Sequence, residues 1–157
     1  MTRVALLAPP WSRADAAEIN SWGHPDRTYE PLLLVRCVQR HPVLAARLRK
    51  LGEALYTEAR LPARVRTIAI LRICALVTGA DADWSSAERV LIDAVDELEC
   101  TGSWAEATWR ALGGTLDDEQ RMELLIAVGW YRTICTLCNG LALPDEGWIR
   151  RWRLSAD

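Results

Sequence analysis

The sequence predicts an all-α fold, a compact multi-helix domain with two buried central helices. Residues 68–77 and residues 118–139 are apolar on nearly every side, which is typical of helices that lie inside a core. Two Ser-x-x-Glu capping boxes, opening at Ser85 and Ser103, mark the starts of two further helices. No segment shows the period-two alternation of a β-strand.

Size and composition favour one soluble globular domain. Half of the 157 residues are hydrophobic and a quarter are charged, and the net charge is −2. This balance argues against a nucleic-acid or acidic membrane partner. The apolar stretch at residues 4–8 is too short for a targeting peptide, and no run is long enough to cross a bilayer, so we expect a cytoplasmic protein. The odd count of five cysteines favours reduced thiols.

The first elements follow from breakers and periodicity. Residues 1–28 form an irregular N-terminal segment, broken by prolines and Gly23, with room for one short helix at residues 13–20. A single helical domain is expected over residues 29–157. It opens with a helix at residues 30–39, which uses Pro31 in its first turn. The next helix starts at His41-Pro42 and carries a one-sided leucine stripe, formed by Leu44, Leu48, Leu51 and Leu55.

The later elements are delimited by caps and glycines. A buried helix opens at Leu61-Pro62 and ends near Gly79. The two capped helices follow, separated by a turn at Thr101-Gly102. A variant capping box, Asp117 with Gln120, begins the longest helix. A short helix after Pro144, with tryptophans among arginines, is expected to dock at a subunit contact.

Four segments carry a family resemblance. Residues 61–72 read LPARVRTIAILR and resemble the signature helix of the carboxymuconolactone decarboxylase family, which belongs with the alkylhydroperoxidase-D-like proteins. Residues 78–84 read TGADADW and resemble its following acidic-Trp segment, while residues 116–141 and 29–44 resemble its last and first helices. The resemblance implies an all-α fold, a homo-oligomer (a trimer or hexamer), and a pocket near the C-terminal end of the signature helix.

The motifs of the family's known chemistry are missing. Its thiol-peroxidase branch has a Cys-x-x-Cys and a later His, and the corresponding positions here are Ala80, Asp83 and Ala87. Its decarboxylase branch has a helix bearing a His, whereas here Trp84 leads directly into the next capping box. Thr67 also stands where the family often has Glu. The usual catalytic residues therefore cannot be carried over.

The first functional hypothesis is a cofactor-free and metal-free acid–base enzyme of lyase or isomerase type. Its substrate would be a small organic acid, lactone or polyketide-like molecule, and a role in secondary metabolism fits. Asp81 or Asp83, just after the buried helix, would move the proton if desolvation raises one pKa. Arg72 or Arg132, each interrupting an apolar helix, would stabilise a developing oxyanion.

Each of these residues also has a structural interpretation. The two arginines can instead pair with internal carboxylates such as Asp81, Asp83 or Glu88, or with an acid of a neighbouring subunit. The two aspartates can form a polar loop that caps the next helix. Further candidates to line the pocket are Tyr131, Trp84 and Trp130, which fit a flat ligand, and His24, which would replace the missing family His.

Two other hypotheses stay open. Cys135 and Cys138 form a CxxC whose spacing places both sulfurs on one helical face, so they could serve a thiol-dependent peroxidase or reductase, with Arg132 stabilising a thiolate. Alternatively they are small buried hydrophobes, although Cys135 would then still border the substrate pocket. The third hypothesis is a non-catalytic, ligand-binding relic of the family.

Overall fold

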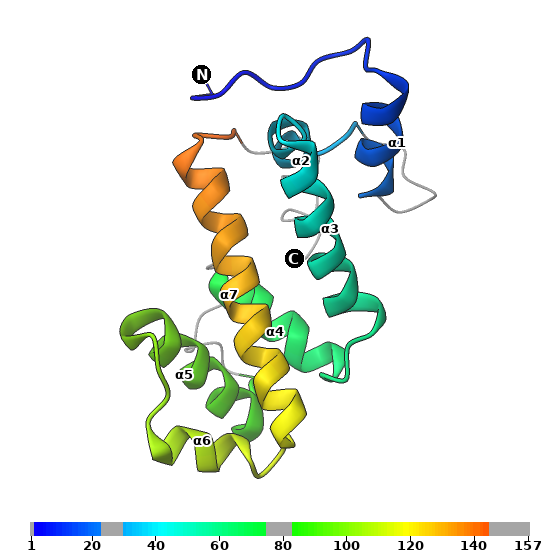
Figure 1. Ribbon diagram of the computed structural model, residues 1–157. Helices are drawn as coiled ribbons and strands as arrows, with labels where there is room; N and C mark the ends of the chain where they lie inside the picture. The colour runs from blue at the N-terminus through cyan, green and yellow to red at the C-terminus, as the bar shows by residue number, and fades with distance from the viewer. Residues whose placement is uncertain (1, 23–29, 75–82, 145–157) are drawn as a thin grey trace. The chain divides into compact units, whose positions relative to one another are not determined.

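The structure, a computed structural model, describes residues 2–22, 30–74 and 83–144. Within these ranges it contains helices and no strand, which confirms the all-α prediction (Figure 1). The helices are α1 (Arg13–Ser21), α2 (Leu33–Val38), α3 (Pro42–Thr57), α4 (Ala63–Ile73), α5 (Ser86–Thr101), α6 (Glu106–Leu112) and α7 (Asp118–Gly140). The expected extension of α4 to residue 77 and the helix after Pro144 lie outside the described residues.

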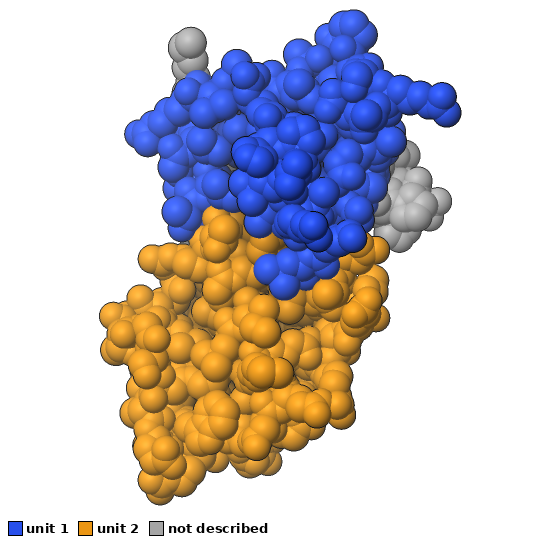
Figure 2. Space-filling view, viewed as in Figure 1, with its two compact units in different colours: residues 1–52, 136–157 blue, residues 53–135 orange. Residues whose placement is uncertain are grey.

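The chain divides into two compact units (Figure 2). The first comprises residues 1–52 and 136–157, and the second comprises residues 53–135. Every described residue of the predicted pocket lies in the second unit. The expectation of one folding domain over residues 29–157 stays a prediction.

In the first unit, α1 is where the sequence placed a short helix. The Ser12 side chain caps it by accepting a hydrogen bond from the Asp15 backbone N–H. Ile19 is completely buried on its inner face. The Gln39 amide donates to the Asp15 carboxylate at 3.0 Å and so ties α1 to the end of α2. The irregular N-terminal segment thus contains a capped and anchored helix.

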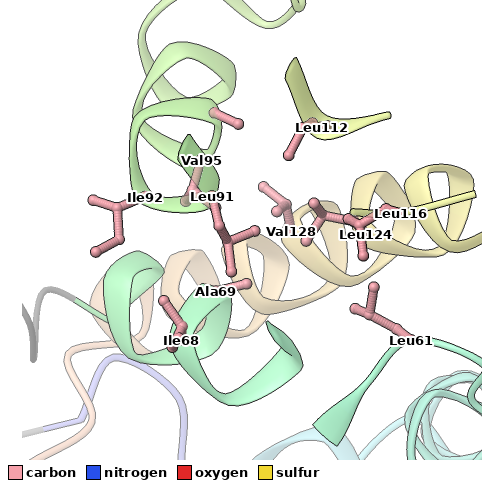
Figure 3. Close-up of a cluster of buried hydrophobic side chains, with 11 residues drawn as sticks. Leu61, Ile68, Ala69, Leu91, Ile92, Val95, Leu112, Leu116, Leu124 and Val128 are labelled. Carbon is pink, nitrogen blue, oxygen red and sulfur yellow. The ribbon is translucent and has the colours of Figure 1, made fainter. Parts of the chain in front are cut away.

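The core of the second unit is a cluster of aliphatic side chains from α4, α5, α6, α7 and the segments that precede α4 and α7 (Figure 3). Ile68 of α4, Ile92 of α5 and Leu124 of α7 are among its completely buried members. Trp104 closes one side, and its indole N–H donates to the Ala94 carbonyl at 2.8 Å. These apolar contacts hold the helices that carry the site.

Two of the three predicted capping boxes are confirmed. Ser85 and Glu88 bond each other's backbone N–H at the start of α5. At the start of α7, the Asp117 backbone N–H donates to the Gln120 side chain at 3.1 Å, and the Gln120 backbone N–H donates to Asp117 at 2.8 Å. The predicted turn after α5 is also present, with Gly102 in the left-handed region at φ 74°.

The predicted capping box at Ser103 is wrong. Helix α6 begins at Glu106 with Ala105 as its N-cap, and no side chain of its own caps it. Instead Glu97 of α5 reaches across and accepts the Ala105 backbone N–H at 2.8 Å. Ser103 lies in the preceding turn, where its backbone N–H donates to Thr101. A carboxylate from another helix thus accepts a backbone N–H at the start of α6, where the sequence suggested a local capping box.

The prediction of two fully buried central helices is not confirmed. Helix α7 buries Leu124, Ala127 and Val128 on one side but leaves Leu125 and Ile126 exposed on another. The completely buried residues of α4 are confined to Ile68 and Ala69. An apolar residue pattern on all sides of a helix does not say which side the rest of the fold will cover. In α7 the face that carries Leu124 is covered, and the face that carries Leu125 is not.

The Glu88 carboxylate makes the capping box of α5 sensitive to acid. Its hydrogen bond from the Ser85 backbone, and next its contact with Arg64, lower its pKa from 4.5 to about 2. Because the pKa is lower in the folded state, the stabilisation is fully present above pH 4.5 and is lost as the pH falls towards 2. We expect Glu88→Gln to lose stability less steeply than the wild type across this window.

Urea unfolding at a series of pH values measures this difference. The substitution keeps a side-chain acceptor for the Ser85 N–H, so the box itself persists. Glu106→Gln, on the exposed pair with Arg110, measures the general effect of removing one surface carboxylate. If the free energy of unfolding falls equally steeply below pH 4.5 in the wild type and in Glu88→Gln, the prediction is contradicted.

Candidate functional site

Arg72 is neutralised by a carboxylate of the neighbouring helix. Its Nε lies 2.5 Å from Oδ1 of Asp96 and its Nη2 lies 2.7 Å from Oδ2, a two-pronged ion pair between α4 and α5. This hydrogen bonding raises the pKa of Arg72 above its ordinary value. The arginine side chain is 25% exposed. The alternative of internal pairing is therefore the one observed, with Asp96 in place of the acids that the sequence suggested.

Arg132 is also paired with a carboxylate of α5, through a single contact, and it lies at the surface. Its guanidinium contacts the Glu99 carboxylate of α5. The Arg132 side chain is 59% exposed, so the expectation of a buried cation inside α7 is wrong. The sequence could not show that this face of an apolar helix is turned to solvent. Together the two ion pairs link α5 to α4 and α7. Each arginine is thus already neutralised by a carboxylate of the protein.

The predicted acid–base residues are not assembled in the described structure. Asp83 is exposed, so it lacks the desolvation that would favour a proton-transfer role. Asp81 and His24 lie outside the described residues. The described residues therefore do not form the acid–base site that the sequence suggested.

The two tryptophans predicted for a pocket pack within the second unit. Trp130 is buried in α7, and Trp84 packs against the core with the Arg64 guanidinium 5.4 Å from its ring centroid. A cavity of about 100 Å³ lies nearby and is lined by Arg64, Ile68 and Leu112 among others. Ligand pockets usually measure roughly 300–1,000 Å³. This cavity is therefore smaller than a usual ligand pocket.

Two thiols meet where α4 ends beside α7. The Sγ atoms of Cys74, the C-cap of α4, and Cys135 of α7 lie 3.9 Å apart. Neither cysteine is in a disulfide, and both are half-buried. A disulfide needs its sulfurs about 2.05 Å apart, so these two thiols are in contact but not bonded. Cys138 lies three residues further along α7, as the CxxC spacing requires.

Two tyrosines lie next to these thiols. The Tyr131 hydroxyl donates to the Tyr56 hydroxyl at 2.5 Å. Tyr131 precedes Cys135 by four residues on α7, so both side chains share one face of that helix. The Arg66 guanidinium lies 4.9 Å from the Tyr56 ring centroid. We call Cys74, Cys135, Tyr56 and Tyr131 the thiol–tyrosine cluster.

The pKa of Tyr131 is shifted by its burial and by its neighbours in the cluster. Burial is the largest influence that raises its pKa, and the hydrogen bond to Tyr56 is the second. Nearby Cys74 raises the pKa further, while the positive charge of Arg66 lowers it. The phenol is therefore protonated throughout the neutral range and is available as a hydrogen-bond donor.

The sequence identified half of this cluster. Cys135 and Tyr131 were candidates because both lie in the last long helix. Cys74 and Tyr56 were missed, since they come from other helices and are separated from their partners by 61 and 75 residues.

No protein-family model matches the chain, and comparisons with curated proteins and with solved structures find no significant match. The family resemblance of the four segments thus stays a prediction, as does the homo-oligomer it implies. In the part of the chain that the structure describes, no group of three or more His, Cys, Asp or Glu side chains is arranged to hold a metal ion. No helix among those residues is long and apolar enough to span a membrane.

Proposed function

We propose that this protein is a thiol-dependent redox protein of the peroxidase or disulfide-reductase type. Cys74 and Cys135 are its reactive pair and cycle between dithiol and disulfide. The observation that carries the proposal is the 3.9 Å contact between their sulfurs. It is the thiol hypothesis of the sequence with a different partner for Cys135, since Cys74 replaces Cys138.

The reaction needs a hydroperoxide as oxidant and an external dithiol as reductant. One thiolate attacks a peroxide oxygen, the O–O bond breaks, and a sulfenic acid and an alcohol form. The second thiol attacks that sulfur, the S–S bond forms, and water leaves. The external dithiol then reduces the disulfide and is itself oxidised. Each cycle moves two electrons and leaves the protein unchanged.

Cys135 is the better candidate for the first attack. Cys74 lies at the C-terminal end of α4, where the negative end of the helix dipole makes a thiolate less stable. Cys135 lies more than one turn before the end of α7 at Gly140, where the effect of the helix dipole has fallen off. Cys74 is then the resolving thiol that closes the disulfide.

The acid–base enzyme hypothesis stays a prediction with less support. Its two cations are occupied by Asp96 and Glu99, and Asp83 is exposed. The relic hypothesis, a ligand-binding protein without catalysis, also stays a prediction. Neither has a described contact comparable with the sulfur pair.

The first test asks which disulfide forms. We expect an equimolar amount of hydrogen peroxide to link Cys74 to Cys135 in the reduced protein, as peptide mapping by mass spectrometry would show. Cys74→Ser and Cys135→Ser abolish the link because each removes one of the touching sulfurs. Cys138→Ser and Cys100→Ser, the latter at an exposed cysteine, are the matched controls and retain it.

Turnover is measured with dithiothreitol as the reductant. Peroxide consumption should be catalytic for the wild type and Cys138→Ser and should fall to the background rate for Cys135→Ser. A link between Cys135 and Cys138, or no intramolecular disulfide at all, would overturn the proposal.

A further inference from the structure

The hydroxyl pair of the cluster has no role in the disulfide chemistry described so far. The half-buried Tyr131 and the exposed Tyr56 bond each other at 2.5 Å, next to Cys74 and the Arg66 guanidinium. A phenol both donates and accepts, so this pair can pass a proton along its length. Here each hydroxyl has the other as its partner.

We propose that Tyr131 is the proton donor to the oxygen leaving group when Cys135 attacks a hydroperoxide, and that Tyr56 holds the Tyr131 hydroxyl in place. This inference rests on the proposed function and adds a catalytic residue to it. The two residues share one face of α7, one turn apart, so a peroxide at the Cys135 sulfur lies on the side of the helix that carries Tyr131.

The proton balance closes without another reagent. Cys135 releases its proton to solvent and its thiolate forms a bond to the outer peroxide oxygen. The O–O bond breaks, and the departing alkoxide takes the Tyr131 proton to leave as an alcohol. The phenolate of Tyr131 is stabilised by the positive charge of Arg66, and it regains a proton from solvent.

The leaving group determines whether this proton is needed. An alkoxide or hydroxide is a strongly basic leaving group and departs faster when it is protonated in the transition state. An aromatic thiolate, as released from a dithiobis-nitrobenzoate disulfide, is weakly basic and departs without a proton. The two reagents therefore separate proton donation from every other property of the site.

The experiment compares the rates at which Cys135 reacts with hydrogen peroxide and with dithiobis-nitrobenzoate. A Cys100→Ser/Cys138→Ser background removes two other thiols and keeps the touching pair. We expect Tyr131→Phe to slow the peroxide reaction by about 100-fold or more. We expect the disulfide reagent to react within roughly twofold of the unsubstituted rate, because its leaving group needs no proton.

Two further variants complete the design. Tyr56→Phe keeps the donor but removes its partner and should give an intermediate loss with peroxide alone. Thr133→Val removes an exposed hydroxyl elsewhere on α7 and should change neither rate.

The outcomes separate this inference from the proposed function. Equal slowing of both reagents by Tyr131→Phe assigns the tyrosine a structural role and overturns the inference. An unchanged peroxide rate in Tyr131→Phe overturns it as well, while the disulfide between Cys74 and Cys135 would still stand. If the unsubstituted pair forms no disulfide with peroxide, the proposed function and this inference both fail.

Discussion

Leu124→Ala is expected to lower the free energy of unfolding by about 3–5 kcal/mol. Leu124 is completely buried in the core of the second unit, among side chains from α4 and α5 (Figure 3). Truncation removes its apolar contacts and leaves a cavity that the surrounding helices fill incompletely. Urea denaturation followed by tryptophan fluorescence measures the loss.

The matched control is the neighbouring residue of the same helix. Leu125 is 38% exposed, so Leu125→Ala should cost less than about 1 kcal/mol. The two substitutions remove the same atoms from α7 and change its helix propensity equally. Similar losses for both variants would mean that the core does not lie on the Leu124 face.

Oxidation of the touching thiols is expected to raise the free energy of unfolding by about 2–4 kcal/mol. A link between Cys74 and Cys135 joins residues 61 positions apart and so removes much of the freedom of the unfolded chain. A link between Cys135 and Cys138 would close a loop of a few residues and would stabilise far less. The size of the increase therefore reports which pair has formed.

This second measurement uses the Cys138→Ser protein with and without peroxide treatment. Denaturation with and without a reductant gives the two free energies. Treated Cys135→Ser serves as the reference and should show no increase. An oxidised protein no more stable than the reduced one would argue against a native-like disulfide at this position.

The two stability predictions concern different parts of the same unit. The core determines whether α4 and α7 pack at all, and the thiol contact exists because they do. The Arg72–Asp96 and Arg132–Glu99 pairs join α5 to these helices. Arg72 and Arg132, which the sequence suggested as substrate-binding residues, thus help to hold together the helices that carry the two sulfurs.

Local signals in the sequence were reliable where the interaction was itself local. The boxes at Ser85 and Asp117 and the left-handed turn at Gly102 are present, because each involves groups a few residues apart. The box at Ser103 failed because Glu97, on another helix, supplied the acceptor. A short-range pattern cannot anticipate a competitor from a distant segment.

The candidate site followed the same division. Tyr131 and Cys135 could be selected because periodicity places them on one helical face. Their partners Tyr56 and Cys74 could not, since nothing in a single sequence ranks one distant hydroxyl or thiol above another. The same limit applied to the arginines, whose need for an acid was apparent although Asp96 and Glu99 could not be chosen in advance.

The amino-acid order alone determined the all-α class and the approximate starts of most helices. Those properties depend on backbone propensity, caps and composition, which act over one or two helical turns. Only the tertiary structure decided which face of α7 is covered, which acids neutralise the arginines, and which sulfur meets Cys135. Each of these depends on packing between helices, and packing free energies are set by shape and distance between residues far apart in the chain.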